Sequence, residues 1–132
     1  MDIMTIINTI LWGAIIVWAI YEIIQYFRRK NAADELTNEE FKENMRKVQI
    51  VDVREKADFD AGHILGARNV PYTQLKQRMN ELRKDTPIYL YDEKKAISSR
   101  ASLYLKKNGY TQLYRLKNGY SKWDGKIKKS KY

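Results

Sequence analysis

Hydrophobic residues follow two different patterns along this chain. Residues 3–27 form a nearly unbroken apolar run, whereas short apolar stretches alternate with polar ones from residue 31 onward. As a helix, the run of 25 residues would be about 37 Å long, which exceeds the ~30 Å hydrocarbon core of a bilayer. Trp18, Tyr21 and Tyr26 are residue types that favour the membrane–water interface. The pattern therefore predicts one membrane helix followed by a folded domain.

The charges around the apolar run distinguish an anchor from a cleaved signal peptide. A signal peptide has a positive start, a shorter apolar core and a small-residue cleavage site. Here the chain starts with Met1-Asp2, and the cluster Arg28, Arg29 and Lys30 follows the run. We predict an uncleaved transmembrane anchor with a basic stop, residues 1–30. By the positive-inside rule this is a single-pass cell-membrane protein with its N-terminus outside and its domain in the cytoplasm.

The remaining residues alternate between strand and helix patterns. Thr37 and Glu40 fit a capping box, which predicts a helix from Asn38 to about Lys47 after a linker over residues 31–36. Further helices are predicted over 72–83 and 98–108 and around Trp123, and strands over 48–53, 88–91 and 113–116. This alternation predicts an α/β domain over residues 37–126, with a mostly parallel sheet covered by helices on both faces, and then a basic tail over 127–132.

Charge and rare residues restrict the chemistry. The net charge is +9, and residues 94–132 carry 12 basic side chains against Asp124 alone. No cysteine occurs, which excludes disulfides, zinc–thiolate sites and cysteine nucleophiles. His63 is the only histidine and has no second histidine or cysteine to complete a metal site. We expect no metal and no cofactor, and we expect the His63 ring to satisfy backbone groups of its loop.

The basic C-terminal third has two candidate binding roles. Lysines mixed with aromatic residues suit nucleic acids, but Tyr104, Tyr110, Tyr114, Tyr120 and Trp123 recur at positions that a sheet and helices use for their core. We therefore expect no nucleic-acid partner. The tail is expected to contact the anionic inner leaflet, although a merely solvated charge run is the alternative. The expected membrane-binding residues are Arg28, Arg29, Lys30, Lys126, Lys128, Lys129 and Lys131.

The stretch from Ile50 to Pro71 reads I-V-D-V-R-E-K-A-D-F-D-A-G-H-I-L-G-A-R-N-V-P. It resembles the signature of the rhodanese domain, a sulfurtransferase fold, and the resemblance extends over about residues 34–126. It implies one α/β domain around a five-stranded, mostly parallel sheet. The residues that carry it are Asp52, Arg54, Gly62, His63, Gly66, Asn69, Pro71, and Trp123 after the turn at Asn118-Gly119.

Physical reasoning assigns structural roles to several of these signature residues. Asp52 and Arg54 alternate with two valines, so we expect the charges to pair locally at the end of a strand. Gly62 and Gly66 are expected to supply a tight path with φ above zero.

The resemblance also locates the loop in which rhodaneses carry their nucleophilic cysteine. In the family the cysteine precedes two variable residues, a glycine, a variable residue, an arginine and a serine or threonine. Aligned without gaps, Asp92 stands at the cysteine, Lys95 at the glycine, Ile97 at the arginine and Ser98 at the serine. The resemblance thus implies a degenerate loop, namely Asp92, Glu93, Lys94, Lys95, Ala96, Ile97 and Ser98.

Each of these replacements removes something that sulfur transfer needs. Asp92 has no sulfur to carry, Lys95 has a Cβ where glycine allows an unusual backbone, and Ile97 cannot clamp an oxyanion as a guanidinium does. We expect Asp92 to cap the next helix rather than to act as an aspartyl nucleophile, which would need magnesium and a second acid.

These observations predict a membrane-tethered, non-catalytic rhodanese-like module that docks an unknown protein partner. The alternatives are a sulfurtransferase-family enzyme that uses a partner's cysteine, and an anion- or phosphate-binding variant.

Overall fold

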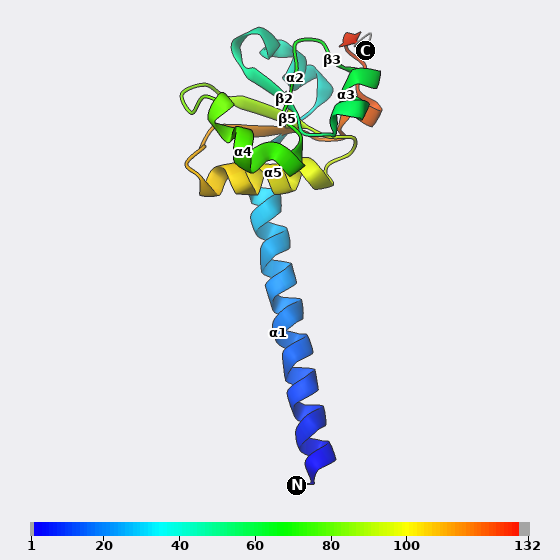
Figure 1. The fold of residues 1–132 in the computed structure, drawn as a ribbon, viewed down its shortest axis with the longest axis vertical. Coiled ribbons are helices and arrows are strands. Elements are labelled where there is room, and N and C mark those ends of the chain that lie inside the picture. The colour runs from blue at the N-terminus through cyan, green and yellow to red at the C-terminus, as the bar shows by residue number, and fades with distance from the viewer. Residues whose placement is uncertain (1, 130–132) are drawn as a thin grey trace.

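The computed structural model describes residues 2–129, apart from the side chain of Lys30. Lys131 therefore lies outside the described residues. The first element, α1 (Ile3–Asn31), is one helix of 29 residues that begins where the Asp2 carboxylate accepts a hydrogen bond from the Thr5 N–H at 2.9 Å. It projects away from the rest of the molecule as a stalk (Figure 1).

The stalk has the length and composition of a membrane span. Its large apolar side chains are 45–73% exposed, and the segment Ile3–Arg29 is long and apolar enough to cross a membrane. The predicted long apolar helix is confirmed. By its length and composition this helix is a candidate membrane span.

The domain is built on a five-stranded sheet in which all strands are parallel, in the order β1-β6-β5-β2-β4. These strands are β1 (Asp34–Leu36), β2 (Gln49–Asp52), β4 (Arg68–Asn69), β5 (Ile88–Tyr91) and β6 (Leu113–Leu116). A second, antiparallel pair joins β3 (His63–Ile64) to β7 (Ile127–Lys128). The predicted parallel α/β architecture is confirmed.

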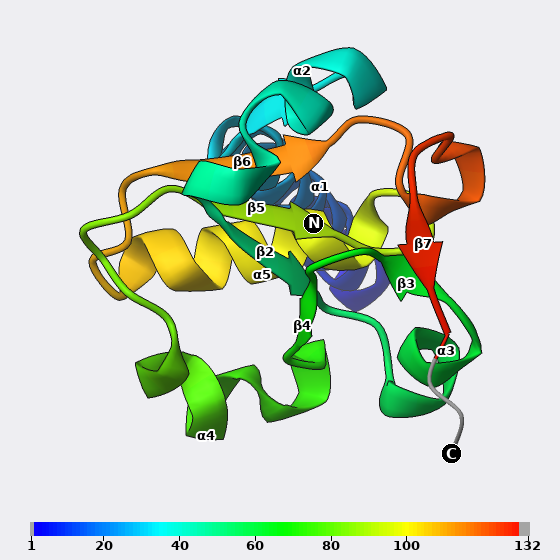
Figure 2. The same ribbon diagram turned by 90° about the horizontal axis from the view of Figure 1, so that it is seen from above.

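Helices cover both faces of the sheet, with α2 on one face and α4 and α5 on the other (Figure 2). The α-helices after the stalk are α2 (Asn38–Glu43), α3 (Lys56–Ala61), α4 (Leu75–Arg78) and α5 (Ala96–Lys107). Four short 3-10 turns complete the domain, namely η1 (Met45–Lys47), η2 (Tyr72–Gln74), η3 (Met79–Glu81) and η4 (Tyr120–Lys122).

The central strands bury alternate residues on opposite faces. In β5, Ile88 and Leu90 join the cluster under α4 and α5, whereas Tyr89 and Tyr91 join the cluster that contains Phe41 of α2. This is the period of two expected for a strand buried on both faces. Four aromatic residues of the basic third pack against these two clusters as well, namely Tyr104, Tyr114, Tyr120 and Trp123, and Tyr110 belongs to the first cluster.

Three expected boundaries are wrong. The segment taken as a linker contains β1, because Ala32 and Ala33 are buried and Asp34–Leu36 pairs with β6 at the sheet edge. The helix predicted over 72–83 is three successive short turns, η2, α4 and η3, which still bring Leu75, Met79 and Leu82 onto one cluster. The predicted start of the tail at residue 127 is wrong, because Ile127–Lys128 pairs with His63–Ile64 and so belongs to the domain.

Candidate functional site

The candidate site is the loop between β5 and α5, at the carboxyl end of the parallel strands, where open α/β sheets place their ligands. Asp92, the first residue of the loop, is only 3% exposed. Its Oδ2 accepts a hydrogen bond from the Ile97 N–H at 2.9 Å, and its Oδ1 accepts one from the Ser98 hydroxyl at 2.8 Å. Both oxygens therefore serve the first turn of α5, as expected for a capping carboxylate.

The turn at Asn118-Gly119 and the residues after it, here called the closing turn, hydrogen-bond to the backbone of this loop. The Tyr120 N–H donates to the carbonyl of Asp92 at 2.8 Å, and the Ser121 N–H donates to the carbonyl of Glu93 at 3.0 Å. Gly119 lies against the backbone of Glu93 and Lys94 with φ +72°, a conformation that side chains rarely adopt. The loop backbone is thus fixed by residues that follow it by almost thirty positions.

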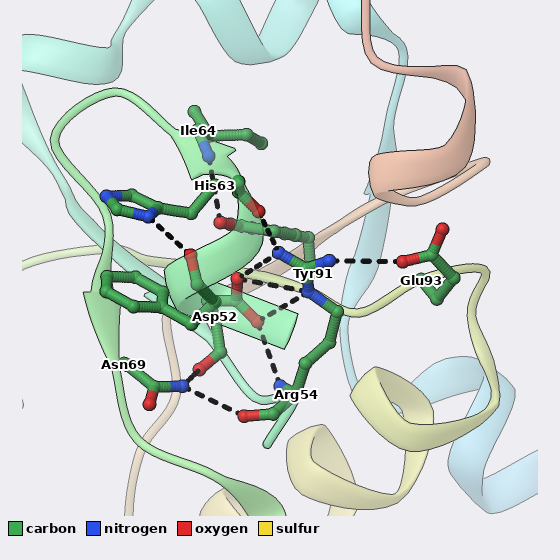
Figure 3. A network of polar contacts seen from close by, with 9 residues as sticks. Asp52, Arg54, His63, Ile64, Asn69, Tyr91 and Glu93 are labelled. Carbon is green, nitrogen blue, oxygen red and sulfur yellow. Dashed lines mark hydrogen bonds and ion pairs between the residues drawn. The ribbon is translucent and has the colours of Figure 1, made fainter. Parts of the chain in front are cut away.

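Asp52 and Arg54 form the buried ion pair of the site (Figure 3). Asp52 has no exposed surface, and its carboxylate accepts from the Arg54 backbone N–H at 2.9 Å and from the guanidinium at 2.8–3.1 Å. The guanidinium also donates to the Gly62 carbonyl at 2.7 Å and to Glu93 at 3.1 Å. The predicted local pairing is confirmed, and the pair also ties the signature strand to α3 and to the candidate loop.

Burial and the charge of Asp52 shift the pKa values of two groups in this network. Burial works to lower the pKa of Arg54, but the hydrogen bonds and negative charge of Asp52 outweigh it and raise that pKa above its ordinary value. Burial, reinforced by the charge of Asp52, raises the pKa of the Tyr91 hydroxyl. Arg54 is therefore a permanently charged structural group, and Tyr91 stays neutral, accepting the Ile64 N–H at 3.0 Å.

The other signature residues surround the same network. The Asn69 amide donates to the carbonyls of Asp52 and Arg54 at 3.1 and 2.9 Å, which locks β4 to the end of β2. His63 is 4% exposed, its Nδ1 lies 2.8 Å from the Phe59 carbonyl, and its ring stacks on Phe59 with a centroid separation of 3.7 Å. The predicted structural role of the histidine is confirmed. Pro71 is buried and starts η2.

The two signature glycines have different reasons for being glycine. Gly66 has φ +92°, as predicted. Gly62 does not have a left-handed backbone, because its φ of 162° is extended. A Cβ at Gly62 would instead lie 2.6 Å from the Tyr120 hydroxyl, so close packing requires its small size. Trp123 follows η4 and packs edge-on against Phe41, which anchors the closing turn.

The remaining loop residues divide between surface and core. The exposed ones are Glu93, Lys94, Lys95 and Ala96. Ser98 is buried, and Ile97 packs against the cluster under α4 and α5. Lys95 does not adopt the positive φ that a glycine would allow at this position: its φ is −158°, and no described non-glycine residue has a positive φ. With a ψ of −14°, Lys95 lies in neither the helical nor the extended region.

A cavity of about 360 Å³ opens between the loop and the signature strand. Four carboxylates line it, Glu55, Asp58, Asp92 and Glu93, against the single guanidinium of Arg54. Arg54 already pairs with Asp52 and Glu93, so its charge is compensated. The electrostatics of this cavity oppose an anionic ligand. The described residues contain no group of three or more side chains placed to hold a metal ion.

Sequence reasoning missed the tyrosines that support the ion pair. The guanidinium carbon of Arg54 lies 4.3 Å from the ring centroid of Tyr120 and 5.8 Å from the ring centroid of Tyr91. The available signal was the position of Tyr91 immediately before Asp92, at the end of a strand whose other tyrosine also faces the second cluster. Aromatic residues at a strand end beside a buried arginine are typical of such stacking.

The expected membrane-binding residues fall into two separate groups. Arg28 and Arg29 lie at the end of α1, beside α5. Lys126, Lys128 and Lys129 lie at or next to β7, on the side of the domain away from the stalk (Figure 1). The geometry therefore separates the described part of the tail from the end of the domain that α1 enters.

Comparisons with known proteins agree with this architecture. The family model for the rhodanese-like domain matches residues 37–126. The uncharacterized protein YqhL of Bacillus subtilis (strain 168) is 52% identical over 112 residues, covering 85% of this chain and 89% of YqhL. The putative sulfur carrier protein YrkF of the same organism is 30% identical over 117 residues, and the alignment covers 80% of this chain and 63% of YrkF.

A solved structure and a further relative give the same assignment. The crystal structure of the Alr3790 protein from Anabaena sp. superposes with a TM-score of 0.68 at 26% identity, covering 73% of this chain and 81% of that chain. The thiosulfate sulfurtransferase GlpE of Shewanella oneidensis is 33% identical over 78 residues, which is 59% of this chain and 77% of GlpE. The parallel sheet, the signature network and these matches together place the chain in the rhodanese-like domain family.

Proposed function

We propose that this protein is a membrane-tethered rhodanese-like domain that binds a protein partner and does not itself transfer sulfur. The observation that carries the proposal is Asp92. It stands at the position where the family's cysteine is expected, it is buried, and both of its oxygens are used to hold the first turn of α5. A side chain engaged in this way has neither the sulfur nor the freedom that a persulfide carrier needs.

The cavity beside the loop supports the same conclusion. Thiosulfate and related sulfur donors are anions, and the four carboxylates around the cavity would repel them. Ile97 packs on the core where the family's arginine would face the substrate. The cation that remains, Arg54, is committed to Asp52. The surface is therefore better suited to contacts with a protein than to binding a small anion.

The similarity to proteins named as a sulfurtransferase and as a putative sulfur carrier favours one second candidate. In that reading the domain would act on sulfur carried by a cysteine of a partner. Transfer would then depend on the partner's thiolate, because residues 1–132 contain no cysteine. The two candidates share the docking step and differ in whether the partner's sulfur moves.

Docking at the loop is tested by site-specific photocrosslinking in native membranes. A photoreactive residue at Lys94, exposed on the candidate loop, should capture a discrete partner that mass spectrometry identifies. The control is the same residue at Lys47, which is also exposed but lies just before β2, at the opposite end of the sheet. Equal capture of the same proteins from both positions would contradict docking at the loop.

The tether gives a second expected result. Because Arg28, Arg29 and Lys30 follow the apolar helix, the domain should lie on the cytoplasmic side of the membrane. An alkaline phosphatase fusion after Tyr132 should therefore be inactive, and a green fluorescent protein fusion at the same place should fluoresce. Strong phosphatase activity would show that the domain lies outside the cytoplasm. Release of the chain from membranes by alkaline carbonate would show that α1 does not anchor it.

A further inference from the structure

A second cavity lies where the stalk meets the domain, and it has the opposite charge to the first. It has a volume of about 370 Å³ and is bounded by the last turns of α1, the start of α5 and strands β1 and β6. Four of its lining side chains are basic and only Glu35 is acidic. We call it the junction pocket.

The inner wall of the junction pocket is a buried, fixed arginine. Arg115 is 1% exposed, donates to the Ser99 hydroxyl at 2.8 Å and pairs with Glu35 at 3.1 Å. Glu35 is thereby committed to Arg115. The acidic side chain of the pocket does not compensate the three outer cations.

Those outer cations are Arg29 of α1, Lys95 of the loop before α5, and Arg100 of α5. Across the described residues, no ion pair joins any of the three to a carboxylate. Three uncompensated cations around one cavity attract an anion, and the guanidinium fork matches the oxygen geometry of a phosphate.

The position of the junction pocket favours a membrane lipid as the source of a bound phosphate group. The 29 residues of α1 would extend about 43 Å, close to the thickness of a bilayer with its headgroups. If α1 spans the membrane, as the proposed function requires, Tyr26 and Arg29 lie at the headgroup level on the domain side. Helix α5 crosses the end of α1 there, so its lower face is turned towards the lipid surface (Figures 1 and 2).

The opposite side of the stalk repeats the charge pattern. A second hollow between α1 and α5 is bounded by Arg28, Lys106 and Lys107 beside the apolar Phe27 and Leu103. These cations also lack ion pairs to described carboxylates. Basic side chains next to apolar ones, at the depth where a span ends, are typical of surfaces that meet anionic headgroups and acyl chains.

We propose that the junction pocket binds the phosphate group of an anionic phospholipid headgroup and thereby fixes the domain on the membrane surface. Arg29, Lys95 and Arg100 hold the phosphate, and the Arg115–Glu35 pair forms the floor beneath it. The face that meets the membrane is then α5 and the end of α1, not the C-terminal tail. This inference rests on the proposed tether, and it assigns to the fixed domain a definite orientation.

The test titrates the full chain, purified in a neutral detergent, with dihexanoyl phosphatidylglycerol and counts bound lipid by native mass spectrometry. One phosphatidylglycerol should bind with an apparent affinity at least about tenfold higher than dihexanoyl phosphatidylcholine. The pair Lys95→Gln/Arg100→Gln, both exposed on the domain, should remove this preference. The matched control Lys126→Gln/Lys128→Gln removes the same charge at β7 and should keep it.

Several outcomes would overturn the assignment. Equal binding of the two lipids, or equal loss in both double variants, would mean that no selective junction pocket exists. Displacement of phosphatidylglycerol by an equal concentration of inorganic phosphate would assign the site to free phosphate instead. If the Lys95→Gln/Arg100→Gln variant has a lowered melting temperature, Arg29→Gln on α1 tests the lipid preference independently. A wild-type chain that shows no lipid preference but still resists carbonate extraction would refute the pocket and leave the tether intact.

Discussion

Replacing Arg54 with methionine is expected to destabilise the domain by about 3–5 kcal/mol, because it leaves a buried carboxylate without its partner. Asp52 has no exposed surface and loses every guanidinium bond, keeping the backbone N–H of residue 54 and its contact with the Tyr91 hydroxyl. Gly62 and Glu93 lose their contacts to the same group. Chemical denaturation of the full chain in detergent, followed by near-ultraviolet circular dichroism, measures the change.

The chain offers a matched control for this prediction. Arg83 and Asp85 form the same kind of two-bond pair, also two residues apart, but both side chains are 69% exposed. Arg83→Met should therefore leave the denaturation midpoint unchanged, since exposed pairs are screened by solvent. Similar losses from both variants would show that burial of the Asp52–Arg54 pair is not what makes it important.

Replacing Gly119 with alanine is expected to disturb the candidate loop as well as the turn. The backbone at φ +72° and ψ −172° costs an alanine about 1–3 kcal/mol. The new Cβ would also overlap the backbone of Glu93 and the carbonyl of Lys94, which adds about 1–3 kcal/mol of overpacking. Hydrogen exchange of the Ile97 amide, held by Asp92, should accelerate together with the loss of stability.

Gly66→Ala separates the two contributions. Gly66 also has a positive φ, of 92°, but a Cβ there meets nothing within 4 Å. It should lose stability through its backbone alone and leave exchange at Ile97 unchanged beyond the global effect. If the two variants behaved identically, the contact between the closing turn and the loop would carry no energy.

The sequence predicted those features that depend on local pattern. The apolar run predicted α1, the capping box predicted the start of α2, and short apolar stretches predicted β2, β5 and β6. The local pairing of Asp52 with Arg54 was predicted, and the structure adds that His63 and Asn69 of the same signature lie beside this pair (Figure 3). Reading Asp92 as a helix cap followed from its place before α5, because a carboxylate there faces free N–H groups.

Features that depend on distant pairing could not be predicted in this way. Strand β1 carries two exposed acidic residues, and only its pairing with β6 makes it a strand. Strand β7 is two residues of a lysine-rich tail that pair with β3 more than sixty positions earlier. The junction pocket combines α1, β1, α5 and β6, so its cations appear in the sequence only as part of a diffuse basic region.

Sulfur transfer by the full chain is the measurement that most directly tests a non-catalytic domain. With thiosulfate as donor and cyanide as acceptor, the wild-type chain should form no thiocyanate above background. The variant Asp92→Cys should also remain at background, because the acidic cavity persists and Ile97 replaces the arginine. Thiocyanate formation by the wild-type chain, saturable in thiosulfate and abolished by Asp92→Ala, would contradict the account.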